Sequence, residues 1–87
     1  MVIIMEKLKF ALKEEEKVLD CVGERIRDLR MKRRMTQDEL AELADISSRN
    51  LSDIENGKVD CHLTTLYAIS KAFNISLSEM FDELQNR

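Results

Sequence analysis

Polar side chains that can donate and accept hydrogen bonds recur at helical spacing near the middle of the chain. One side of a helix would carry Arg49, Ser52, Asp53 and Asn56, because successive residues turn by about 100°. The aliphatic Leu51 and Ile54 would lie on the other side. A short helix of this kind is suited to reading base edges in the major groove of DNA. The alternative is an ordinary amphipathic helix with a solvated outer face, and the pattern alone leaves both interpretations open.

Two short helices joined by a tight turn are predicted to position these side chains. Thr36 can cap the first helix, and Glu39, three residues later, completes a capping box. Asp45 tolerates a left-handed backbone and therefore suits the turn. Ser47 can cap the second helix, which the pattern continues to Gly57, a typical helix end.

The rest of the chain is also predicted to be helical, because it has no proline and only two glycines. One helix precedes the pair, from residue 24 to about residue 34. A fourth helix starts near Leu63 and ends at Asn74, which tolerates the left-handed conformation. Ser76 and Glu79 form a second capping box that opens a last helix. The aromatic side chains of these helices are expected in the core rather than stacked on nucleic acid: Tyr67, Phe73 and Phe81.

Three runs of residues in the helix pair follow a known pattern: Gln37-x-Glu39-Leu40-Ala41, Ile46-Ser47 and Leu51-Ser52-x-Ile54-Glu55-Asn56-Gly57-Lys58. Together they resemble the Cro/phage-repressor (XRE-type) helix-turn-helix family, and the match extends over roughly residues 23–81. Two positions depart from the usual family pattern. Asp45 stands where the family usually has glycine, and Asp53 stands where the second helix often has a basic residue.

The resemblance implies an all-α fold with a five-helix lambda-repressor-like DNA-binding domain in residues 23–87. The spacing of apolar residues before it predicts an additional N-terminal helix in residues 1–22. The resemblance also implies an ion pair between Arg30 and Glu55 that ties the first helix of the family fold to the end of the second helix of the pair. The implied function is sequence-specific regulation of transcription by a homodimer bound to a palindromic operator in double-stranded DNA. Base contacts are expected from the outer face of the second helix: Ser48, Arg49, Ser52 and Asp53. Phosphate contacts are expected from Gln37, Asn56 and Lys58.

Charge is unevenly distributed along a chain whose net charge is −3. Residues 23–35 hold six basic and two acidic groups, whereas residues 36–46 hold four acidic groups and no basic one. A local basic patch can face phosphates although the whole chain is acidic. The acidic total and Asp53 also fit a rival function, a protein-interaction module or antitoxin-like partner protein that keeps the fold without DNA. Four basic side chains are expected to be free for solvent or phosphate: Arg25, Lys32, Arg33 and Arg34.

Residues with catalytic or metal-binding chemistry are sparse. Cys21, Cys61 and His62 supply too few ligands for a zinc site, and His62 has no partners at a catalytic spacing. The two cysteines are expected to be reduced packing residues, and no catalytic site, metal or cofactor is predicted. The apolar run at residues 2–5 is too short for a signal peptide or membrane span, so a cytoplasmic protein without membrane contact is expected.

The first 22 residues lie outside the family resemblance and begin an apolar stripe with spacings of three and four residues. Glu15 is its one break. The stripe either packs on its own domain or forms a homodimer contact through paired helices. The apolar face of the last helix, from Leu77 to Phe81, is the other surface available for a dimer contact. A short strand at residues 2–5 that pairs across a two-fold axis is a further alternative, and Gly23 is predicted to break or kink the chain. The stripe consists of Met5, Leu8, Leu12, Leu19, Val22, Ile26 and Leu29.

Overall fold

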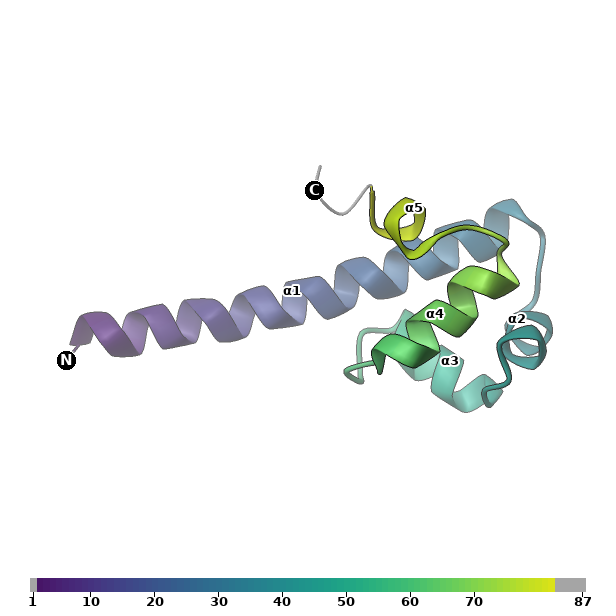
Figure 1. The fold of residues 1–87 in the computed structure, drawn as a ribbon. Coiled ribbons are helices and arrows are strands. Elements are labelled where there is room, and N and C mark those ends of the chain that lie inside the picture. The colour runs from purple at the N-terminus through teal and green to yellow at the C-terminus, as the bar shows by residue number, and fades with distance from the viewer. Residues whose placement is uncertain (1, 83–87) are drawn as a thin grey trace.

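The computed structural model describes residues 2–82, with side chains from Glu16 onward. In this range every regular element is a helix, so the all-α prediction is confirmed. The five helices are α1 (Val2–Lys32), α2 (Gln37–Ala44), α3 (Ser48–Glu55), α4 (Leu63–Ala72) and α5 (Leu77–Phe81) (Figure 1). None of these helices combines the length and the apolar character needed to cross a lipid bilayer.

α1 is one continuous helix of 31 residues. Its C-terminal half packs against α3 and α5, whereas its N-terminal half extends away from the other four helices (Figure 1). The predicted additional N-terminal helix is therefore continuous with the first helix of the family fold, and the predicted break at Gly23 is wrong. Residues 2–5 are helical, so the alternative of a strand there is also wrong. The stripe positions Met5, Leu8 and Leu12 belong to α1, but their side chains are outside the described residues.

Gly23 is helical and lies where α1 crosses the C-terminal end of α3. A Cβ atom at position 23 would lie 2.5 Å from the carbonyl oxygens of both Ile54 and Glu55. Backbone atoms of a packed helix cannot rotate away as the end of a flexible side chain can, so only glycine fits this crossing. Glycine inside a helix costs about 1 kcal/mol relative to alanine, and the close packing of α1 on α3 offsets that cost.

The hydrophobic core lies between the C-terminal half of α1 and the four shorter helices. Phe73 is buried and Phe81 is half-buried against this core, as expected. Tyr67 is 51% exposed, so its assignment to the core is wrong. It precedes the buried Ile69 by two residues and therefore points about 200° away from it around α4. The Nζ of Lys71 lies 5.4 Å from the centre of the Tyr67 ring.

The helix ends follow the predicted caps. The Oγ1 of Thr36 accepts from the N–H of Glu39 at 3.1 Å, while Glu39 Oε1 accepts from the N–H of Thr36 at 3.2 Å. Ser76 begins α5 with the second predicted capping box. Asp45 and Asn74 adopt φ angles of 57° and 59°, the left-handed conformation predicted for both. These local predictions are confirmed.

Candidate nucleic-acid interface

A three-residue turn joins α2 to α3 and sets the start of α3. Asp45 leaves α2 in the left-handed conformation, and Ser47 is extended, with its Oγ accepting from the N–H of Asn50 at 3.0 Å. The Oγ of Ser48 donates to the carboxylate of Asp38 on α2. The turn is therefore held by a cap on one side and by a hydrogen bond between side chains on the other.

α3 has a buried side and an exposed side. Leu51 and Ile54 are buried, as the spacing predicts. Arg49 and Asn50 are exposed. The remaining three predicted base-contact residues are half-buried: Ser48, Ser52 and Asp53. Arg49 is thus the most accessible of the four residues predicted to contact bases.

The carboxylate of Glu55 is fully buried and connects α1, α2 and α3. Arg30 donates to both of its oxygens, from Nε at 2.8 Å and from Nη2 at 3.0 Å, so the implied ion pair is present and bidentate. Hydrogen bonding to Glu55 is the main cause that raises the pKa of Arg30 above its usual range, against the effect of burial. Gln37 Nε2 also donates to Glu55 Oε1 at 3.1 Å, and Arg27 Nε lies 3.7 Å from the same oxygen.

Two of the predicted phosphate contacts already have partners inside the domain. The side-chain amide of Gln37 is bound to Glu55 as described. The Oδ1 of Asn56 accepts from Arg27 Nη2 at 2.8 Å, and its Nδ2 donates to the carbonyl of Ser52 at 2.9 Å. Lys58, the third predicted phosphate contact, is exposed in the loop after α3.

The basic patch is smaller than the sequence suggests. Arg25 is buried, and its Nε and Nη2 donate to the carbonyls of Met80 and Glu79 at 2.8 and 3.2 Å, so the expectation that it is free is wrong. Arg33 Nη2 donates to the carbonyl of Phe73 at 3.1 Å, and its guanidinium lies 5.0 Å from the centre of the Phe73 ring. Both arginines hold α1 against the C-terminal elements. Two cations of this segment are exposed and have neither a side-chain hydrogen bond nor an ion pair among the described residues: Lys32 and Arg34.

The arrangement of α2, turn and α3 also matches a family of known proteins. Residues 26–80 fit the model of the helix-turn-helix family HTH_3. The chain belongs to this family. The match begins within α1, so the whole N-terminal half of that helix lies outside the matched region.

Named relatives of this helix-turn-helix protein include two repressors. The immunity repressor protein of Bacillus phage phi105 is 40% identical over 62 residues, which cover 71% of this chain and 43% of that repressor. The competence pilus inhibition repressor of Acinetobacter baylyi is 37% identical over 60 residues, covering 69% and 54% of the two chains. The match spans about half of each relative. The crystal structure of the restriction-modification controller protein C.AhdI from Aeromonas hydrophila superposes with a TM-score of 0.73 at 26% identity, covering 75% of this chain and 98% of the controller.

Sequence reasoning missed two residues of this helix-turn-helix surface. Asn50 is exposed on α3 beside Arg49 and was not among the predicted base contacts. Arg27 lies one helical turn before Arg30 and therefore on the same side of α1, where it reaches Asn56. The three-residue spacing of Arg27 and Arg30 was the sequence feature that could have indicated that both side chains point toward the end of α3.

Proposed function

We propose that this chain is a sequence-specific, double-stranded DNA-binding regulator of transcription that acts as a homodimer on a palindromic operator. The observation that carries the proposal is the exposure of Arg49 on α3. This helix follows the turn after α2 and buries Leu51 and Ile54 on its other side. The named relatives are repressors, which supports the same class. The proposed function is binding without catalysis, and the proposed location is the cytoplasm.

In this proposal the outer face of α3 reads bases. Arg49 is exposed, and its planar guanidinium matches the two acceptors of guanine in the major groove. Asp53 accepts from a cytosine amino group or orients Arg49. Ser48 and Ser52 supply hydroxyl groups to neighbouring bases.

Phosphate contacts fix the register of α3 in the groove. Gln37 is the first residue of α2, where backbone N–H groups have no intrahelical acceptor and favour an anion. Asn56 and Lys58 follow α3, and Arg27 adds a second cation beside Asn56. Because the Gln37 side chain is bound to Glu55, its backbone is the group we assign to the phosphate.

Two alanine substitutions separate base reading from phosphate binding. Arg49→Ala should weaken binding to a selected operator by about 1–3 kcal/mol and weaken binding to unrelated duplex much less. Lys58→Ala should weaken binding to both duplexes alike and reduce the slope of log K against log salt by about one per monomer. Fluorescence titrations of both variants on both duplexes at several salt concentrations measure these effects. Equal weakening of the two duplexes by Arg49→Ala would make Arg49 a phosphate contact and contradict its assigned role.

A protein-interaction module is the second candidate. It is favoured by the internal use of Arg25, Arg30 and Arg33, which leaves fewer cations for phosphates than the sequence contains. In that case the exposed face of α3 would bind a protein, and Arg49→Ala would not change binding to any duplex.

A further inference from the structure

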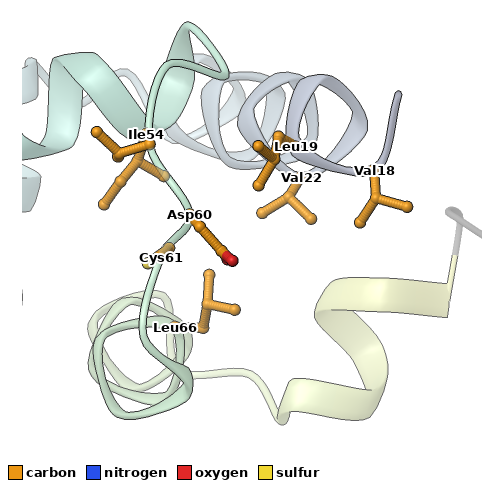
Figure 2. Close-up of a pocket in the computed structure, with 8 residues that line it drawn as sticks. Val18, Leu19, Val22, Ile54, Asp60, Cys61 and Leu66 are labelled. Atoms are coloured by element: carbon orange, nitrogen blue, oxygen red, sulfur yellow. The ribbon is translucent and has the colours of Figure 1, made fainter. Parts of the chain in front are cut away.

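An apolar groove opens between α1, the loop after α3 and α4 (Figure 2). Its volume is about 100 Å³. Val18, at one end, is 55% exposed. The carboxylate of Asp60 is the one charged group among the described residues of a lining that is otherwise apolar. Burial, together with the negative charge of Asp60, raises the pKa of the Cys61 thiol. The residues that form its two walls are Val18, Leu19 and Val22 on α1, and Val59, Cys61 and Leu66 opposite.

The groove lies at the N-terminal end of the stretch of α1 that faces the core. Leu19 and Val22 line it, while Ile26 and Leu29, further along the helix, are buried in the core. These four positions form one stripe with spacings of three and four residues, the spacing of helices that pair along a seam. The domain therefore covers the C-terminal half of the stripe and leaves the groove end partly open.

The same register continues through the part of α1 that projects beyond the domain. From Val2 to Lys17 the helix is about 24 Å long at 1.5 Å per residue. In Figure 1 no other described element lies beside this part of α1. The register places sequence positions Leu12, Leu8 and Met5 on the stripe, with Glu15 as the one charged position. A projecting helix with an apolar stripe requires a second apolar surface to cover it.

We propose that the occupant of the groove is the N-terminal segment of α1 from a second copy of this chain, so that two α1 helices pair in antiparallel orientation. The contact is reciprocal, since each copy contributes one groove and one segment. The inference rests on the homodimer of the proposed function and gives it a specific surface. The segment that would enter the groove lies before the helix-turn-helix match at residues 26–80.

Charge favours this occupant and this orientation. The helical register places Lys9 beside the apolar stripe of the N-terminal segment, and a cation there complements the Asp60 carboxylate of the groove. In a parallel pair the two Glu15 positions would face each other across the seam, where like charges repel. In an antiparallel pair with position 5 opposite Val22, position 15 faces Leu12 instead, and the first turns of α1 reach the groove.

Sedimentation of the full-length protein without DNA tests the surface. The parent chain should be a dimer, and Val18→Glu should raise its dissociation constant at least about a hundredfold, because a carboxylate would be buried in the seam. Met31→Glu is the matched control, since Met31 is an exposed apolar residue of the same helix at 63% exposure. Its dissociation constant should equal that of the parent. A monomeric parent, or a Val18→Glu chain that dimerises as the parent does, would overturn the proposal.

A cysteine cross-link tests the orientation with a native thiol as the probe. Met5→Cys in a Cys21→Ser background should, on mild copper–phenanthroline oxidation, give a covalent dimer joining position 5 of one chain to Cys61 of the other. Peptide mapping identifies the linked positions. A bond between the two position-5 thiols, or no covalent dimer, would overturn the antiparallel pair. DNA binding by α3 is measured separately, so its loss or survival does not decide this outcome.

Discussion

Replacing Glu55 with glutamine should lower the free energy of unfolding by about 3–5 kcal/mol, because it removes the charge from a buried, bidentate ion pair. The Glu55 side chain has no exposed surface, and that of Arg30 is 14% exposed. The neutral amide would also turn an N–H₂ group toward the donors of Arg30 and Gln37, which now both donate to the carboxylate. Urea denaturation followed by circular dichroism measures the change.

Glu42→Gln is the matched control for this substitution. Glu42 is exposed on α2, so the same chemical change there should alter stability by no more than about 0.5 kcal/mol. If the urea midpoint of Glu55→Gln equals that of Glu42→Gln, the Arg30–Glu55 pair contributes no more than a solvent-screened surface pair.

Gly23→Ala should destabilise the protein by about 3 kcal/mol, at the upper end of the range for overpacking. The sign is the informative part of this result. An alanine in the middle of a helix is normally more stable than glycine by about 1 kcal/mol. Here the added methyl group would meet the carbonyl oxygens of Ile54 and Glu55 at 2.5 Å, so α1 and α3 must separate. Thermal and urea unfolding both measure the loss.

Lys32→Ala tests whether the effect comes from the crossing rather than from α1 itself. Lys32 is exposed at the end of the same helix, and alanine there should change stability only slightly. A Gly23→Ala protein as stable as the parent, or more stable, would show that α1 and α3 tolerate a wider separation at this point.

Local features of the fold were predictable because short-range chemistry decides them. Thr36 with Glu39 forms a capping box from residues three apart, and Asp45 adopts the left-handed turn that its side chain tolerates. Arg30 and Glu55 are 25 residues apart, so local spacing does not connect them. Their pairing was expected from the family resemblance.

Long-range packing decided the features that the sequence did not predict. Gly23 is read locally as a helix breaker, but its position is set by carbonyl groups of α3 that lie far away in the sequence. Arg25 is read as a surface cation, but the carbonyl groups of Glu79 and Met80 at α5 satisfy its guanidinium in the interior. Among the candidate site residues, the exposure of Arg49 followed from helical spacing, whereas the internal partners of Gln37 and Asn56 did not.

The central claim is that α3 reads a specific duplex sequence, and selection from a random duplex library tests it most directly. The parent protein should enrich an inverted repeat whose half-sites are centred about 10–10.5 base pairs apart, or a multiple of that spacing. The Arg49→Ala variant, selected in parallel, should lose the preference at one position of each half-site. A library that remains unenriched after repeated rounds with the parent protein would contradict sequence-specific recognition of DNA by α3.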